Sequence, residues 1–212
     1  MDNILKEFEV LKKNLQNLPI ENLSDYNLSK TVLFIVDINN GFTKEGILCS
    51  DRVKALINPI YEFAKPLEDK LNKIIAFTDT HEKDSVELSS YPVHCLRGTD
   101  ECKVVDELLD IKNLEIIPKN STNGFFAMDV KILDDIENVV VVGDCTDICV
   151  YQFAVTLKAY FNEKNINKNI IVPMDLVDTY DTPFVHPGNL LNIVFFNSML
   201  QNGVKLIKKF SL

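Results

Sequence analysis

The stretch VVVVGDCTDICV, residues 139–150, contains the pattern that decides the fold. Four valines followed by a glycine predict a short buried strand, and the apolar spacing from Cys149 to Phe161 predicts a helix directly after it. A cysteine at this position lies where free backbone N–H groups and the helix dipole favour a thiolate. A lone cysteine is more often a small buried apolar residue, so the rest of the sequence must decide what Cys149 does.

Further strand and helix patterns lie on both sides of this stretch. Apolar runs predict strands at 31–36, 73–78, 115–117, 169–173 and 204–207, and apolar spacing predicts helices at 3–17, 51–69, 101–109 and 187–201. This alternation is typical of an α/β protein, a three-layer sandwich with helices on both faces of a central, mostly parallel sheet of about six strands. We expect residues 30–212 to form this domain and residues 1–29 to form an N-terminal helical extension. The apolar stripe of that extension packs either on the same chain or on a second subunit. The sequence therefore allows a homo-oligomer without requiring one.

The composition restricts the partners and the compartment. The chain has 212 residues, with 46% hydrophobic and 25% charged residues, which suits one folded domain. A formal charge of -9 argues against a nucleic-acid partner, since phosphates require a basic surface. The N-terminus lacks the apolar core of a signal peptide, and no apolar run approaches the roughly 20 residues that a bilayer requires. Five cysteines without disulfide-framework spacing indicate free thiols, so we expect a cytoplasmic protein without a membrane partner.

Three reactive side chains follow the ends of predicted strands, namely Asp37, Lys119 and Cys149. The carboxyl ends of neighbouring parallel strands share one edge of the sheet, so residues far apart in sequence can meet there. An acid, a lysine and a cysteine are the groups needed for thiolate attack on a carbonyl. The carboxylate takes the thiol proton and returns it to the leaving group, while the ammonium holds the thiolate. An Asp37 that only caps a turn is the alternative.

A second group of polar residues lies in the short segment 79–94, which contains two of the three histidines. Imidazole and carboxylate ligands together suit Zn²⁺, Mn²⁺ or Fe²⁺. Residues two apart on an extended chain point the same way, so an Asp-x-His pair at a strand end can supply two ligands from one face. Asp84 competes for the fourth ligand position, and surface histidines beside a capping aspartate are the alternative. The candidate ligands are Asp79, His81, Glu87 and His94.

These motifs together resemble the isochorismatase-like cysteine hydrolases. VDINNGF (36–42) is similar to the aspartate-bearing first strand of that family, PKNSTNGFFA (118–127) to its lysine segment, and VVVVGDCTDICV to its nucleophile motif. The resemblance covers about residues 30–210.

Within the family, the metal loop resembles that of the nicotinamidase and pyrazinamidase branch. DTH (79–81) followed by YPVHCLRGT (91–99) is similar to the branch pattern, and the spacing of Glu87 looks like that of members with a glutamate ligand. Two positions depart from the pattern: Thr80 replaces an aromatic residue and Val93 replaces a proline. Every residue expected to bind the metal is still present.

The resemblance implies a fold, a reaction and a set of residue roles. Cys149 attacks the carboxamide of nicotinamide, Asp37 exchanges the proton, and Lys119 keeps the charges paired while a thioester forms and is hydrolysed. The backbone N–H groups of Cys145 and Cys149 form the oxyanion hole, with a cis peptide between Asp144 and Cys145. The products are nicotinate and ammonia, as in NAD salvage.

The resemblance also implies a cofactor and a substrate pocket. One divalent metal, Zn²⁺ before Mn²⁺ or Fe²⁺, binds the pyridine nitrogen of the substrate, and Phe42 and Tyr91 sandwich its ring. A hydrolase of another small amide, a hydrolase of an isochorismate-like substrate, and a catalytically silent binding subunit are the alternatives. His186, Cys49 and Cys102 match no motif, and we expect them to be structural or surface residues.

Overall fold

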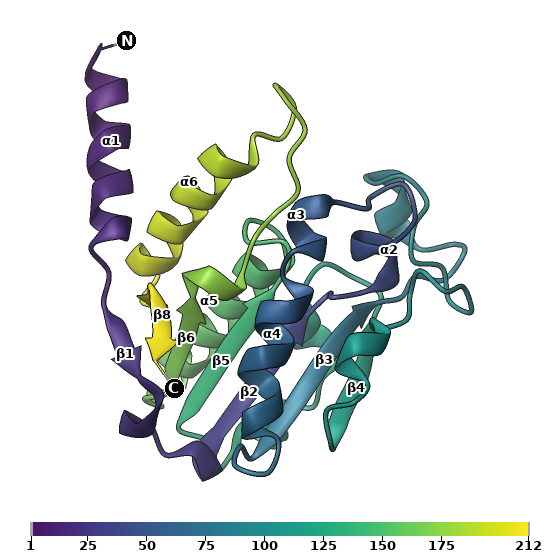
Figure 1. Cartoon of the computed structure of the whole chain (residues 1–212), viewed down its shortest axis with the longest axis horizontal. Helices are drawn as coiled ribbons and strands as arrows, with labels where there is room; N and C mark the ends of the chain where they lie inside the picture. The colour runs from purple at the N-terminus through teal and green to yellow at the C-terminus, as the bar shows by residue number, and fades with distance from the viewer. Residues whose placement is uncertain (1, 212) are drawn as a thin grey trace.

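A six-stranded parallel sheet forms the centre of the molecule (Figure 1). The structure is a computed structural model that describes residues 2–211. The strand order is β4-β3-β2-β5-β6-β7, and every neighbouring pair is parallel. The strands are β2 (Thr31–Val36), β3 (Lys73–Asp79), β4 (Leu114–Lys119), β5 (Asn138–Gly143), β6 (Asn169–Pro173) and β7 (Lys205–Ile207). The sheet predicted from the sequence is therefore confirmed.

Helices cover both faces of this sheet, which makes the three predicted layers. Alternate residues of a strand face opposite sides, so Phe34 packs into one core while Leu33 and Ile35 pack into the other. The side chains of α5 and α6 fill the first core, and those of α3 and α4 fill the second. The α-helices are α1 (Asp2–Gln16), α2 (Asn40–Thr43), α3 (Asp51–Lys54), α4 (Ile57–Ala64), α5 (Cys149–Glu163) and α6 (Gly188–Gln201).

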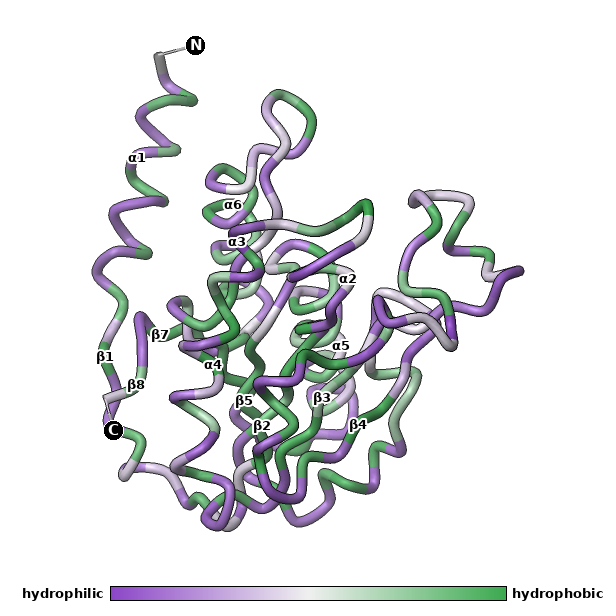
Figure 2. The backbone as a smooth tube through the Cα atoms, turned by 45° about the vertical axis from the view of Figure 1, so that its right-hand side comes forward, coloured by the Kyte–Doolittle hydropathy of each residue, from purple (hydrophilic) through white to green (hydrophobic). Residues whose placement is uncertain are grey.

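The central strands are apolar because they are buried on both sides. Every residue of β2 and of β5 is buried, and Figure 2 shows these strands as a hydrophobic centre within more polar connections. Phe34, Phe77 and Phe153 pack ring against ring, with centroids 4.8–5.3 Å apart. This aromatic packing fixes α5, and with it Cys149, against β2 and β3.

The prediction of a helix at 101–109 is wrong. Only a short 3₁₀ turn, Asp106–Leu108, forms there, because the preceding backbone runs beside residues 38–41 and bonds to them instead. The N–H of Gly41 donates to Glu101 O at 3.0 Å, and the N–H of Val105 donates to Ile38 O at 3.1 Å. The helix predicted at 51–69 is divided into α3, α4 and a 3₁₀ turn, Lys65–Leu67, that contains Pro66.

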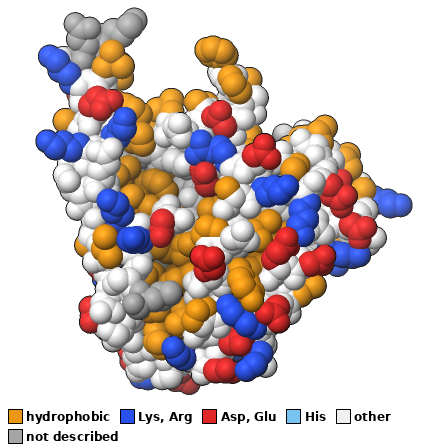
Figure 3. Space-filling model, viewed as in Figure 1, with side chains coloured by type: hydrophobic (Ala, Val, Ile, Leu, Met, Phe, Trp, Pro, Cys, Tyr) orange, Lys and Arg blue, Asp and Glu red, His pale blue; other side chains and the backbone are white. Residues whose placement is uncertain are grey.

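The N-terminal segment contacts the C-terminal one. Strands β1 (Ile20–Asn22) and β8 (Lys209–Ser211) form a parallel pair that the sequence did not reveal, since both are short and largely exposed. Helix α1 lies beside α6, and Leu15 near its end is buried, whereas Ile4 and Leu5 are 70% and 60% exposed (Figure 1). Figure 3 shows hydrophobic side chains gathered in the hollow beside α1. Within residues 2–211, every helix falls short of the length and apolar character that a bilayer crossing requires.

Candidate active site

The reactive residues meet at the carboxyl edge of the sheet. Asp79 and Lys119 are register partners at the ends of β3 and β4, and Asp37 directly follows β2. The last residues of β2 and β5, Val36 and Gly143, are also partners, so the turn after β5 begins at the same level. Parallel pairing thus brings together side chains that are up to about a hundred residues apart in the chain.

Gly143 allows the end of β5 to approach the end of β2 closely. Its φ is +113°, and a Cβ at this position would lie 2.1 Å from the backbone oxygen of Val36. Only glycine fits such a conformation without displacing β2. The glycine therefore fixes the distance between Asp37 and the turn that leads to Cys149.

Lys119 is the central cation of the site. Its Nζ atom lies 2.8 Å from Asp37 Oδ2, 2.8 Å from Asp79 Oδ1 and 3.8 Å from Cys149 Sγ. The lysine is 1% exposed. Burial acts to lower the pKa of Lys119, but the charges of Asp37, Cys149 and Asp79 raise it well above its usual value. Lys119 is therefore a permanent ammonium that holds the two acids and the sulfur in place.

Asp37 has the properties of a proton acceptor. Burial raises the pKa of Asp37 to about 6, although the charge of Lys119 opposes the rise. Its φ is +53°, a conformation that an aspartate rarely adopts, and its Oδ1 has no hydrogen-bond partner among the described residues. A buried, unpaired carboxylate oxygen with a raised pKa can take up a proton from a thiol and release it again.

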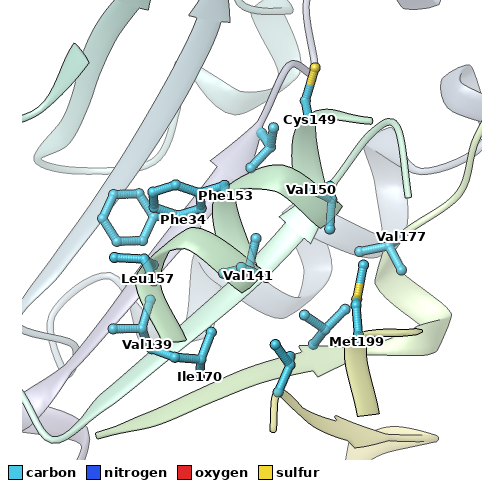
Figure 4. Close-up of a cluster of buried hydrophobic side chains, with 14 of the residues drawn as sticks. Phe34, Val139, Val141, Cys149, Val150, Phe153, Leu157, Ile170, Val177 and Met199 are labelled. Carbon is cyan, nitrogen blue, oxygen red and sulfur yellow. The ribbon is translucent and has the colours of Figure 1, made fainter. Parts of the chain in front are cut away.

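Cys149 is the first residue of α5, and its side chain lies at the edge of the core. Figure 4 shows its sulfur directed away from Phe153 and Leu157, which pack deeper along the same helix. We expected the helix N-terminus to favour a thiolate, but burial raises the pKa of Cys149 well above its usual value despite the charge of Lys119. The thiol is therefore neutral at rest and needs a base, which Asp37 can supply.

The turn between β5 and α5 offers free backbone donors. The peptide between Asp144 and Cys145 is cis, as the family resemblance implied. Among the described residues, the N–H groups of Cys145 and Cys149 donate no hydrogen bond, while that of Val150 donates to Cys145 O at 3.1 Å. Two unused N–H groups next to a nucleophile can stabilise a negatively charged oxygen.

Asp79, His81 and His94 form a compact group of atoms that could hold a metal ion. One ligand atom from each lies within 4.8 Å of the other two, and all three residues are buried. Nε2 of His81 and Nε2 of His94 lie 2.9 and 3.0 Å from Asp79 Oδ2. The Nδ1 atoms face acceptors instead: His94 Nδ1 is 2.7 Å from Pro92 O, and His81 Nδ1 is 3.2 Å from Asn120 Oδ1. Each Nε2 thus faces Asp79 Oδ2, and two imidazoles beside a carboxylate are a donor set that fits a divalent metal of the zinc type.

The two candidates for the fourth ligand lie in different surroundings. Glu87 borders the cavity, with Oε1 3.8 Å from His81 Nε2, while its Oε2 accepts a hydrogen bond from the N–H of Thr122 at 2.9 Å. Asp84 is exposed on the preceding loop. Glu87 is therefore the carboxylate that faces the metal-binding group.

An apolar cavity lies over these groups. Phe42 and Tyr91 are on its wall, with ring centroids 5.8 and 6.1 Å from that of His94. Other residues of the wall are Leu48, Val53, Ile148 and Tyr180. A cavity with aromatic walls, a nucleophile and a metal-binding group is shaped for a small flat molecule with a polar substituent.

Several residues of the site were missed in the sequence. Asn120 holds His81, and it could have been found because it directly follows Lys119. Asp144 is 1% exposed, borders the cavity and has one oxygen without a hydrogen-bond partner among the described residues. Burial raises its pKa well above the usual value. No local pattern distinguishes Asp144 or Tyr180 from ordinary loop residues, so neither could be found from the sequence.

The fold and this arrangement of residues define the class of protein, and the chain belongs to the isochorismatase family. The model of the Isochorismatase domain matches residues 31–207. The chain is 26% identical to Nicotinamidase 1 of Arabidopsis thaliana, and the match covers 96% of both chains. The predicted resemblance to the nicotinamidase branch is thus confirmed.

Solved structures share the fold at lower identity. The pyrazinamidase of Pyrococcus horikoshii, solved in complex with zinc, has a TM-score of 0.68 and 21% identity over 84% of this chain and 98% of its own. N-carbamoylsarcosine amidase from Thermoplasma acidophilum has a TM-score of 0.68 and 21% identity over 84% of this chain and 95% of its own. At this level of identity, these likenesses show the fold alone.

Proposed function

We propose that this chain hydrolyses nicotinamide to nicotinate and ammonia with Cys149 as the nucleophile. The observation that carries the proposal is the position of Lys119. Its ammonium joins Asp37 on the nucleophile's side to Asp79 on the metal-binding side, so the two groups of residues form one site. The family membership and the similarity to a curated nicotinamidase support the same reaction.

The first half of the reaction forms a thioester. Asp37 takes the proton of the Cys149 thiol, and the sulfur forms a bond to the carboxamide carbon. The N–H groups of Cys145 and Cys149 donate to the oxygen that becomes negatively charged. The carbon–nitrogen bond then breaks, and the nitrogen leaves as ammonia with the proton that Asp37 returns.

The second half regenerates the thiol. Asp37 takes a proton from a water molecule, whose oxygen attacks the thioester carbon. The carbon–sulfur bond breaks, nicotinate is released, and the Cys149 sulfur receives the proton from Asp37. Lys119 stays close to both acids throughout, so no step leaves a buried negative charge unpaired.

The metal-binding group supports a pyridine ring as the recognised part of the substrate. A divalent metal held by Asp79, His81 and His94, with Glu87 as the fourth ligand, supplies a Lewis-acidic site for the ring nitrogen when bound. We propose Zn²⁺, because two imidazoles with carboxylates are its usual ligands. Phe42 and Tyr91 then line the faces of the ring.

Product analysis tests the proposal against its alternatives. The purified, zinc-loaded chain is incubated with nicotinamide, pyrazinamide and acetamide, and ammonia and the free acid are measured. We expect equal amounts of nicotinate and ammonia from nicotinamide, and little turnover of acetamide, which has no ring. Ammonia from acetamide alone would indicate another small amide as substrate, and no ammonia from any amide would support a silent binding subunit.

Separate alanine substitutions of the two candidate fourth ligands test the metal site. Glu87→Ala should weaken zinc binding about 10–100-fold, because a carboxylate next to His81 is lost. Asp84→Ala is the matched control, since this acid lies a few residues away on the same loop but is exposed. Zinc affinity is measured by competition with a chromogenic chelator. Weaker binding in Asp84→Ala with no change in Glu87→Ala would reverse the assignment.

A further inference from the structure

His186, which matches no sequence motif, is held firmly beside the nucleophile turn. Its Nε2 lies 2.8 Å from Asp147 Oδ2, and its Nδ1 lies 3.0 Å from the backbone oxygen of Tyr180. Asp147 is two residues before Cys149, and its other oxygen accepts a hydrogen bond from Thr179 Oγ1 at 2.6 Å. The loop between β6 and α6 is thus tied to the turn that carries the nucleophile.

Hydrogen bonds and a ring stack hold His186 in one orientation. Both ring nitrogens lie within hydrogen-bond distance of an oxygen, which restricts rotation of the imidazole about its side-chain bonds. The imidazole ring lies flat against Tyr180, with centroids 3.6 Å apart and an interplanar angle of 14°. Contact between two stacked rings is favourable, and the hydrogen bond to Asp147 fixes the position of the imidazole.

The tyrosine in this stack also borders the cavity. Tyr180 is on its wall together with Tyr91 and Cys145. Burial raises the pKa of Tyr180 to about 12, and the nearby Cys145, Asp147 and Tyr91 contribute to the rise. Tyr180 therefore lines the same cavity as Cys145 and Cys149 of the nucleophile turn. His186 covers one face of the ring, and this stacked contact favours the position of the ring at the cavity.

We propose that Tyr180 is a third aromatic wall of the substrate cavity, and that His186 is the positioning residue that holds it there through Asp147. Together with Phe42 and Tyr91, this wall selects a flat aromatic ring over an aliphatic acyl group. The inference rests on the proposed function, because the ring in question is that of nicotinamide. It assigns substrate contact to Tyr180 alone, while His186 acts through Tyr180.

Binding measured without turnover tests the wall directly. Zinc-loaded Cys149→Ala protein is titrated with nicotinamide by calorimetry, alone and with a second substitution. Adding Tyr180→Ala should weaken binding about tenfold, because an aromatic contact is lost, whereas adding Tyr180→Phe should change it less than about twofold. Phe184→Ala is the control on the same loop, since Phe184 is fully exposed at its tip and should have no effect. Unchanged binding in the Tyr180→Ala protein overturns the proposal.

Two substitutions of His186 test its positioning role in the otherwise native enzyme. His186→Gln keeps a donor for Asp147 but loses the stack, and His186→Phe keeps the stack but loses the hydrogen bond to Asp147. Each should raise KM for nicotinamide about three- to fivefold with kcat within about twofold, because the attacking groups are untouched. A purely structural role would instead lower the amount of active enzyme and leave KM unchanged, and this result would contradict the assignment. If Cys149→Ala protein binds no nicotinamide at all, the result contradicts nicotinamide as the substrate and, with it, the proposed aromatic wall.

Discussion

Cys149→Ala should abolish ammonia release from nicotinamide, with a loss on the order of 10⁴-fold or more, because no other group can form the thioester. The fold should remain intact, since the sulfur is directed away from the core and alanine suits the first turn of a helix. Steady-state kinetics and circular dichroism on the same preparation measure both expectations.

The free thiols outside the site provide the control for this substitution. Cys49 is exposed, and Cys49→Ala should retain the wild-type rate. Substantial activity in Cys149→Ala would exclude the cysteine mechanism. Loss of activity in both variants would indicate that thiol removal acts through stability.

Lys119→Met should cost both activity and stability. The substitution leaves Asp37 and Asp79 buried without their shared counterion, and breaking a buried ion pair of this kind costs about 3–5 kcal/mol of unfolding free energy. Turnover should fall to the background rate, because Asp37 and the sulfur lose the cation that aligns them. Urea unfolding followed by circular dichroism gives the stability, and ammonia release gives the activity.

A second buried lysine separates the two effects. Lys168 Nζ donates to the backbone oxygens of Leu133, Asp134 and Ile136, away from the site, so Lys168→Met should destabilise the fold and leave kcat of the folded fraction unchanged. If Lys119→Met behaves in the same way, Lys119 is structural and has no part in the reaction.

The sequence was most informative where burial alone controls structure. The runs TVLFIV and NVVVVG have to be covered on both faces, and the alternation of strands with helices leaves few topologies for a parallel sheet. The segment 101–109 shows the limit of this reasoning. Its apolar spacing resembles a helix, but its backbone groups find partners in residues 38–41, which a local pattern cannot reveal.

The site was predictable to the extent that it lies at strand ends. Asp37, Lys119 and the candidate ligands at 79–81 lie at the ends of strands that could be recognised, so their meeting at one edge could be expected. The double role of Asp79, which faces both His81 and Lys119, could not be expected from the sequence, because it depends on the register of β3 and β4. The pKa of Cys149 was also misjudged, because burial outweighs the helix terminus, and burial depends on tertiary packing.

The stretch VVVVGDCTDICV contains two cysteines, and only Cys149 is expected to form a covalent bond with the substrate. Enzyme mixed with nicotinamide is quenched in acid within milliseconds, digested and analysed by tandem mass spectrometry. We expect a nicotinoyl group on Cys149, with Cys145 unmodified because it acts through its backbone N–H. A nicotinoyl group on Cys145, or rapid turnover without any acylated cysteine, would contradict the account.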